Sequence, residues 1–162
     1  MTFEWFSSNH LGSCAVLHTL DDFLSIAQRK RQCEHHLDNF ILMCNYLGIS
    51  LAPEKMVGPV TVLQFAGIML DSVHQEAWLP DDKLWKCRVM LQGFQAQCSV
   101  RLKELQSLIG LLNFTCLVVV LGWVFLRHMI DLTKGIKKPH YHICLSQGAK
   151  LDIMLSDVSW WF

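Results

Sequence analysis

Residues 14–27 read CAVLHTLDDFLSIA and decide the class of fold. Within them, two short apolar runs, AVLHTL and FLSIA, flank the adjacent pair Asp21 and Asp22. Short apolar runs interrupted by two aspartates predict a β-hairpin with the acidic pair at or beside its turn. Carboxylates that meet at a turn can approach one divalent cation, because hard cations prefer oxygen ligands. On the pair alone, a solvated turn is the simpler interpretation.

The rest of the chain alternates helical and extended patterns, which predicts a mixed α+β fold. Apolar residues recur at steps of three and four from Cys33 to Leu47, and Gly48 follows as a helix terminator. Residues 60–70, VTVLQFAGIML, are strand-like. Three further elements are predicted: a helix opened by Pro80-Asp81-Asp82 and reaching about Gln95, a helix from Leu102 to about Leu112, and a strand at His140–Leu145.

The composition is apolar and balanced in charge. Of 162 residues, 52% are hydrophobic and 17% charged, with 14 Lys and Arg against 14 Asp and Glu. Such a chain can build one buried core or two pieces of a larger one, and it is neither disordered nor collagen-like. A net charge of zero argues against a nucleic-acid binder that is basic over its whole surface. The low charged fraction predicts apolar surface that is meant to be covered.

The seven cysteines are scattered and contain no Cys-x-x-Cys pair, which excludes a zinc ribbon and a thioredoxin-like motif. Weak metal candidates are Cys33 with His36 and Cys44 on one helix face, the pair His35-His36, and His140-Tyr141-His142. Free thiols in an intracellular protein are the preferred interpretation. Residues 1–13 show no basic region followed by an apolar stretch, so we expect no secretory signal and a location in the cytoplasm or nucleus.

One segment raises the alternative of a membrane location. Leu105 to Leu126, LQSLIGLLNFTCLVVVLGWVFL, contains no charged residue. As a single helix it would be about 33 Å long, which is enough to cross the apolar part of a bilayer. Arg127 and Lys134 follow it, which would place the C-terminus in the cytoplasm. The alternatives are a buried helix, or two helices broken near Gly122, within a globular fold.

Four motifs, in this order along the chain, resemble those of reverse transcriptases. His18–Leu24, HTLDDFL, resembles the Y-x-D-D motif, which retrotransposons carry as H-Y-L-D-D-F-L. Leu47–Lys55, LGISLAPEK, is similar to the segment after it, which ends in a functional lysine. Phe65–Ile68, FAGI, resembles the primer grip, and Leu105–Phe114, LQSLIGLLNF, resembles the first thumb helix. The phrases are most similar to the RNA-directed DNA polymerases of DIRS-type retrotransposons.

The resemblance implies an α+β fold made of part of a right-handed polymerase. Residues 1–79 would be a partial palm with the Y-x-D-D-like hairpin, a helix and the primer-grip strand. Residues 80–133 would be the helices of the thumb. Residues 134–162, which begin with KGIKKPHYH after Ile130–Thr133, would start the connection or RNase H-like region.

The family's reaction is nucleotidyl transfer, in which two magnesium ions assist attack of a primer hydroxyl on a nucleotide. By the resemblance, Asp21 would be a magnesium ligand and Asp22 a second acidic contributor. Lys55 would be the candidate proton donor to the departing pyrophosphate.

The resemblance also implies contacts with an RNA or DNA template–primer. Phe65, Ala66 and Gly67 would position the primer end. Gln106, Gly110 and Asn113 would lie on the thumb face toward the duplex, where a glycine permits close approach of the backbone.

The chain departs from the family pattern at several places. It contains no counterpart of the strand that carries the family's other catalytic aspartate, so we expect it to be inactive alone and to need an upstream polymerase half. Thr19 stands where the motif has tyrosine, and Arg101 stands where relatives open the thumb helix with a threonine cap. Residues 120–123, VLGW, replace a polar link that often reads R-P-G-R.

Three functions therefore remain open from the sequence. The first is a truncated reverse-transcriptase-like protein derived from a retrotransposon. The second is a small single-pass membrane protein in which Leu105–Leu126 inserts. The third is a nucleic-acid-binding remnant without chemistry that uses Arg29–Arg31 and Lys134–Lys138. For the first, the absent half of the palm would leave a sheet edge and an apolar face exposed.

Overall fold

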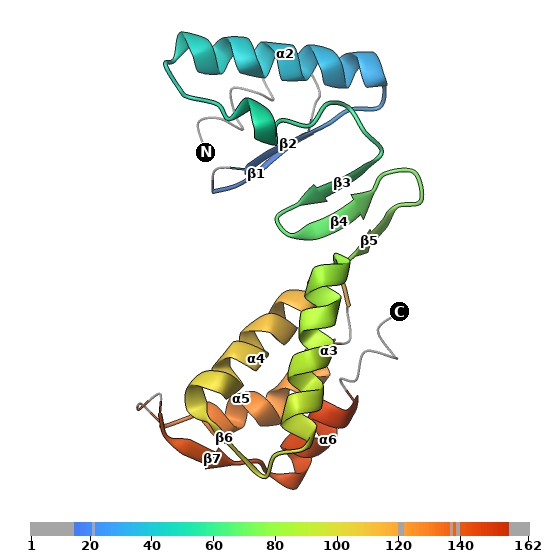
Figure 1. Ribbon diagram of the computed structural model, residues 1–162. Helices are drawn as coiled ribbons and strands as arrows, with labels where there is room; N and C mark the ends of the chain where they lie inside the picture. The colour runs from blue at the N-terminus through green and yellow to red at the C-terminus, as the bar shows by residue number, and fades with distance from the viewer. Residues whose placement is uncertain (1–14, 21, 120–121, 137, 139, 156–162) are drawn as a thin grey trace. The chain divides into compact units, whose positions relative to one another are not determined.

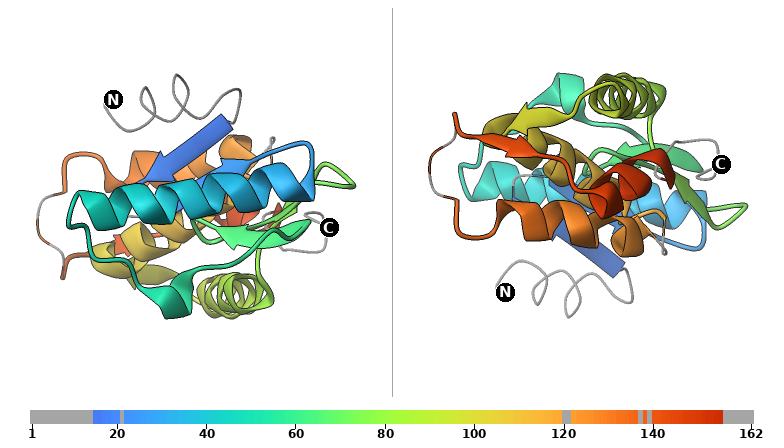
Figure 2. Two further views of the ribbon diagram at one scale, coloured as in Figure 1. Left: turned by 90° about the horizontal axis from the view of Figure 1, so that it is seen from above. Right: turned by 90° about the horizontal axis from the view of Figure 1, so that it is seen from below.

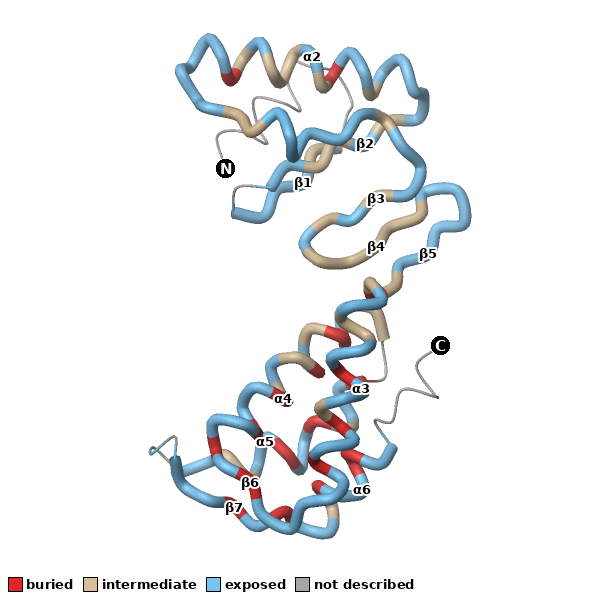
Figure 3. The backbone as a smooth tube through the Cα atoms, viewed as in Figure 1, coloured by how far each residue is buried: buried red, intermediate tan, exposed pale blue. Residues whose placement is uncertain are grey.

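The structure is a computed structural model that describes residues 15–20, 22–119, 122–136, 138 and 140–155. The chain forms two compact units, Met1–Ala77 and Trp78–Phe162, and each is described by itself (Figure 1). Helices and small antiparallel sheets occur in both units, so the predicted α+β class is confirmed. Buried positions concentrate in the second unit (Figure 3).

The first unit opens with the hairpin predicted around the acidic pair. Strand β1, Ala15–Thr19, pairs antiparallel with β2, Asp22–Ile26, and Thr19 lies opposite Asp22. The two-residue connection places Leu20 at its tip with φ of 56° and 91% of its surface exposed. This left-handed conformation is unfavourable for a leucine, because its Cβ crowds the backbone.

Helix α2, Lys30–Tyr46, packs against β2 and begins three residues before the helix predicted from Cys33. The Phe40 ring lies 5.1 Å from that of Phe23, which also stacks on His18 at 6.0 Å. The helix ends as expected before Gly48, whose φ of +70° is the left-handed conformation that glycine adopts readily. Within the part of this unit that the structure describes, only His36 and Cys44 are buried.

The strand-like segment at residues 60–70 is extended, but it forms two strands joined by a tight turn and not a single strand. Strand β3, Val62–Phe65, pairs with β4, Ile68–Asp71, and β5, Glu76–Trp78, completes a three-stranded antiparallel sheet. Ala66 and Gly67 form the turn, with φ of 49° and 80°. Two successive residues at positive φ are typical of the type I′ turn, whose twist matches that of a hairpin. The phrase FAGI is therefore a turn between two strands.

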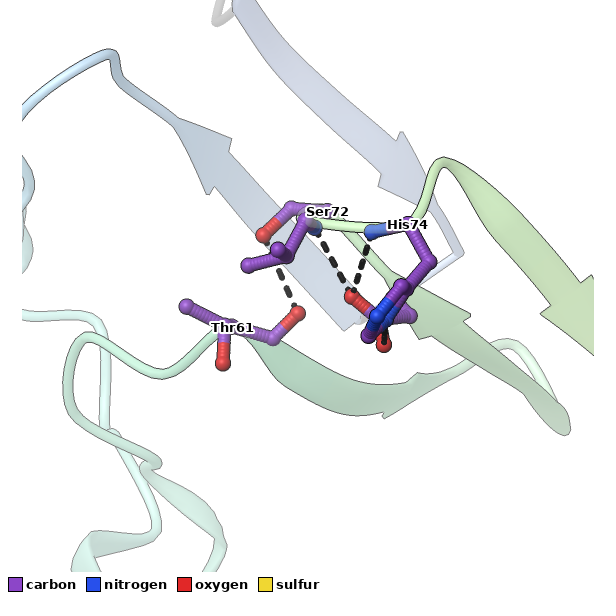
Figure 4. A network of polar contacts seen from close by, with 5 residues as sticks. Thr61, Ser72 and His74 are labelled. Atoms are coloured by element: carbon purple, nitrogen blue, oxygen red, sulfur yellow. Dashed lines mark hydrogen bonds and ion pairs between the residues drawn. The ribbon is translucent and has the colours of Figure 1, made fainter.

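Polar contacts fix the connection that follows β4 (Figure 4). Asp71 Oδ1 accepts the backbone N–H groups of Val73 at 2.7 Å and His74 at 3.1 Å, while Asp71 Oδ2 lies 2.7 Å from His74 Nδ1. The backbone N–H and the hydroxyl of Ser72 both donate to the Thr61 carbonyl, at 2.9 and 3.0 Å. A carboxylate that accepts from the backbone N–H groups two and three residues further on is a common stabiliser of such turns.

This turn should respond to pH. The side-chain hydrogen bond that His74 donates to Asp71 raises the pKa of His74, and the same bond, followed by the two backbone bonds, lowers the pKa of Asp71. The stability that protonated His74 adds to the folded state is fully present below the ordinary histidine pKa. It is lost as the pH rises through the raised pKa. The stability that ionised Asp71 adds to the folded state is fully present above the ordinary aspartate pKa. It is lost as the pH falls through the lowered pKa. The turn is therefore most stable between the two ordinary values.

Asp71→Asn tests this coupling, because asparagine keeps an oxygen for the backbone bonds and loses the charge. We expect the pKa of His74, followed by NMR of its ring protons, to fall toward the ordinary histidine value in this variant. A His74 titration that is the same in both proteins would contradict the coupling.

The second unit consists of packed helices and a short two-stranded antiparallel ribbon. Its elements are α3 (Asp81–Gln95), β6 (Ser99–Arg101), α4 (Leu102–Thr115), a 3-10 helix (Gly122–Leu126), α5 (Arg127–Thr133), β7 (His142–Cys144) and α6 (Gln147–Leu155). Pro80 precedes α3 and Asp81 and Asp82 occupy its first turn, as predicted. Carboxylates are favourable there because they face the positive end of the helix dipole.

The core of this unit is made of apolar side chains from every one of its helices and from the ribbon. Its largest fully buried members are Leu91, Val100, Leu102, Leu105, Leu108, Leu112, Leu126, Met129 and Ile153. Cys87 lies in the same core, where burial raises the pKa of its thiol to about 11. The six cysteines that the structure describes are all free, in agreement with the preferred interpretation.

Leu105–Leu126 does not form the single helix that the membrane alternative requires, and the alternative of two helices broken near Gly122 describes it better. Helix α4 ends at Thr115, and turns follow it before the 3-10 helix that begins at Gly122. Among the residues that the structure describes, no helix has the length and apolar character needed to cross a bilayer. The uncharged run is explained by the core of the second unit. Its leucines recur at steps of three and four on α4 and are buried in that core, while Gln106 and Asn113 on the same helix are exposed.

The segment after residue 134 belongs to the same compact unit. Strand β7 pairs with β6, which confirms a strand within His140–Leu145, and α6 packs on α3 and α5. Asp152 of α6 is buried and accepts both the backbone N–H of His128, at 3.3 Å, and its Nδ1, at 3.0 Å. A Cβ on Gly148 would lie 3.0 Å from the His128 ring, so a larger residue there would require the ring to shift by a few tenths of an ångström.

Candidate nucleic-acid interface

Asp22 of the acidic pair lies next to the turn of the first hairpin, opposite Thr19. Asp22 is the first residue of β2 and is exposed, whereas Asp21 lies outside the described residues. Among the described residues, no group of three His, Cys, Asp or Glu side chains is placed to hold a metal ion. A magnesium ion held by protein needs more oxygen ligands than Asp22 provides. The described residues therefore do not make up a magnesium site, and we derive no chemical step through one.

The other predicted catalytic and primer-positioning residues lie in the same unit. Lys55 is the last residue of a short 3-10 helix, Pro53–Lys55, and is exposed. Phe65 ends β3 and is partly buried, while Ala66 and Gly67 form the turn after it. These residues occupy turns and element ends, where a side chain or backbone group is accessible to a ligand.

The first unit exposes many large apolar side chains. Leu17 on β1 is 49% exposed and Ile26 on β2 is 47% exposed. Both alternate with Phe23, which packs on α2, so they lie on the face of the hairpin that is turned away from that helix. About half of the surface of each side chain is exposed, which agrees with the apolar surface expected from the composition.

The predicted thumb residues do form one surface. Gln106, Gly110 and Asn113 are exposed and lie four and three residues apart on α4, so they share one side of the helix. Lys103 is exposed one turn before Gln106 and extends the same strip. No heavy atom lies within 4 Å of the place where a Cβ on Gly110 would be. We call these four residues the α4 strip: Lys103, Gln106, Gly110 and Asn113. The strip is polar and exposed, and at its centre the glycine leaves the helix backbone accessible.

The zero net charge conceals an uneven distribution between the units. Residues 1–77 contain four Lys and Arg against eight Asp and Glu, and residues 78–162 contain ten against six. The second unit is therefore basic and the first is acidic. A basic unit that presents an open polar helix face is suited to the phosphate backbone of a nucleic acid.

Sequence reasoning missed this separation because it counted charges over the whole chain. A count on each side of residue 80, where the predicted palm ends, would have found it. The pair of His128 and Asp152 was also missed, since nothing in the sequence links positions 24 residues apart. Sequence spacing reports only neighbours on one element.

The weak metal candidates gain no support among the described residues. Cys33, His36 and Cys44 are all on α2, but no metal-binding group forms there. His140 and His142 are exposed, and His142 is the first residue of β7. In the basic run Arg29–Arg31 at the start of α2, Lys30 pairs with Glu34 at 3.9 Å across one helical turn, so part of its charge is neutralised.

No model of a known protein family matches the chain, and no curated protein matches it either. The resemblance to reverse transcriptases therefore rests on the four ordered sequence motifs alone.

Proposed function

We propose that the chain is a truncated reverse-transcriptase-like protein that binds a template–primer duplex through its second unit and does not synthesise DNA alone. Its two units correspond in this proposal to the end of a palm and to a thumb. The observation that carries the proposal is the exposed strip on α4, in a unit with ten basic against six acidic residues.

The places of the other motifs support the same proposal. The described residues of the Y-x-D-D-like motif fall on a hairpin, with Asp22 next to its turn, and the primer-grip-like phrase falls on a tight turn. Both are positions where a polymerase would present groups to a substrate. Independent motifs in the family's order on suitable local structures make descent from a polymerase the best explanation of the chain.

Loss of synthesis is proposed on chemical grounds. Two-metal phosphoryl transfer needs carboxylates from more than one place in the palm, and these 162 residues offer one acidic pair by the resemblance. Thr19 also replaces the aromatic residue of the motif and cannot pack on a primer end as a ring would. An upstream polymerase half would supply the other carboxylate and would cover the apolar face of the β1–β2 hairpin.

A magnesium-dependent primer-extension assay tests the inactivity. We expect no extension by the chain alone on a primed RNA template. Robust extension that disappears in Asp21→Asn would show that the chain is a polymerase by itself, and the proposal of a truncated, inactive protein would then be wrong. Extension that persists in Asp21→Asn would point to a contaminating polymerase and is the control for that case.

A further inference from the structure

The ribbon of β6 and β7 presents a polar face to solvent. The two strands lie at the end of the second unit where α4 begins (Figures 1 and 2). Val100 and Ile143, at the centre of each strand, are buried in the core, so the residues on either side of them point outward. Arg101 lies directly opposite His142 on this outer face, and both are exposed. The side chains of such a pair reach the same region of solvent.

Backbone hydrogen bonds bring more basic residues to this end of the ribbon. The N–H of Leu102 donates to the carbonyl of Tyr141 at 2.9 Å, and the N–H of Tyr141 donates to that of Lys138 at 3.1 Å. The start of α4 and the turn before β7 therefore lie together. The resulting ribbon-end patch consists of the exposed residues Arg101, Lys103, Lys138, His140 and His142.

The patch is not neutralised by described residues. Within the part of the chain that the structure describes, none of its five side chains makes an ion pair. Glu104 is the acidic side chain tied to this end, and its Oε2 accepts the backbone N–H of Arg101 at 3.3 Å. The patch thus keeps more positive than negative charge.

Arg101 also occupies a position where arginine is unfavourable. It is the residue that precedes α4, and it makes no side-chain capping hydrogen bond. Serine, threonine, aspartate and asparagine are preferred there because their oxygens accept helix N–H groups, whereas a guanidinium has no acceptor. A residue that breaks a local rule of stability is the kind expected at a functional site.

We propose that the ribbon-end patch binds phosphate groups of a nucleic-acid backbone, with Arg101 and His142 as paired donors. This inference extends the proposed function, on which it rests for the identity of the ligand. The patch continues into the α4 strip through Lys103, one turn before Gln106. A backbone that follows the strip would therefore reach the ribbon. The guanidinium supplies a forked, charged donor set, which suits phosphate oxygens.

The test measures binding of the full chain to a fluorescent RNA–DNA duplex by anisotropy, between about 50 and 200 mM salt. We expect Arg101→Ser to weaken binding about 3- to 10-fold and to lower the slope of log K against log salt by about 1. The same variant should unfold at an equal or higher temperature than the parent chain, because serine is a preferred cap. His142→Gln, which leaves the cap position untouched, should also weaken binding.

Lys86→Gln is the matched control, since it removes one exposed charge from the middle of α3, away from the ribbon. It should leave the affinity close to that of the parent chain. Equal binding and equal salt slopes for Arg101→Ser and the parent would overturn the inference. If both variants of the ribbon bind normally while a variant of the α4 strip does not, the inference fails and the proposed function stands.

Two further outcomes are decisive. If the parent chain binds no duplex at low salt, the inference and the proposed nucleic-acid binding fail together. Polyglutamate is the competitor that represents an acidic protein partner. If it displaces the duplex as effectively as unlabelled duplex does at equal charge, the patch is a site for acidic protein segments and the inference is overturned. We expect polyglutamate to compete weakly.

Discussion

Replacing Leu108 by alanine is expected to lower the free energy of unfolding of the second unit by about 2–5 kcal/mol. Leu108 has no exposed surface and lies at the centre of the α4 face that fills the core, between Leu105 and Leu112. Truncation removes buried methyl groups and leaves a cavity that the surrounding helices fill only in part. Urea denaturation followed by circular dichroism measures the loss.

Leu117→Ala is the control from the same uncharged segment. Leu117 is 66% exposed, so its truncation should change the free energy of unfolding by no more than about 0.5 kcal/mol. If Leu105–Leu126 were a membrane helix, the two substitutions would have similar effects, because both leucines would lie in the apolar part of the bilayer. Equal and small effects of the two substitutions on the folded protein in water would contradict the core described for α4.

Gly110→Glu should abolish most of the duplex binding while the fold is kept. The glycine is exposed at the centre of the α4 strip, and a Cβ there would have no heavy atom of another part of the chain within 4 Å. A glutamate would raise the low point of the strip and would set a carboxylate against the phosphates. Like charges at an interface cost several kcal/mol, so we expect binding at least about tenfold weaker.

Gly93→Glu is the matched control for this substitution. Gly93 is also an exposed helical glycine with nothing within 4 Å of its missing Cβ, but it lies on α3. Both variants gain the same charge and the same helix propensity. Binding that falls equally in the two proteins would mean that only net charge matters, and the strip would lose its special role.

Much of the local structure could be predicted because its signals are local. Pro80 and the two aspartates after it mark the start of α3, and the run before Gly48 shows the spacing of an amphipathic helix. The hairpin at residues 60–70 was read as one strand because its turn uses Ala66 at positive φ instead of the usual asparagine or glycine. The uncharged segment Leu105–Leu126 left a membrane helix and a buried core helix as alternatives, because both can lack charged residues.

The candidate site was predictable only within single elements. The resemblance to reverse transcriptases implies that Gln106, Gly110 and Asn113 share a face of the thumb helix, and their spacing of four and three residues on α4 agrees with this. The pairing of Arg101 with His142 joins residues 41 positions apart, and no sequence period reports such a contact. From the sequence, Arg101 is the loss of a threonine cap at the start of the thumb helix. That interpretation holds for α4, but it does not reveal that Arg101 lies opposite His142 in the ribbon.

Duplex binding by the unmodified chain as a function of salt tests the central claim most directly. If the basic second unit holds the phosphate backbone, log K should fall linearly with log salt, with a slope of about −0.9 for each phosphate contacted. With contacts along both the α4 strip and the ribbon, we expect a slope of roughly −3 to −5. An affinity that does not change with salt, or no binding even at low salt, would contradict the account.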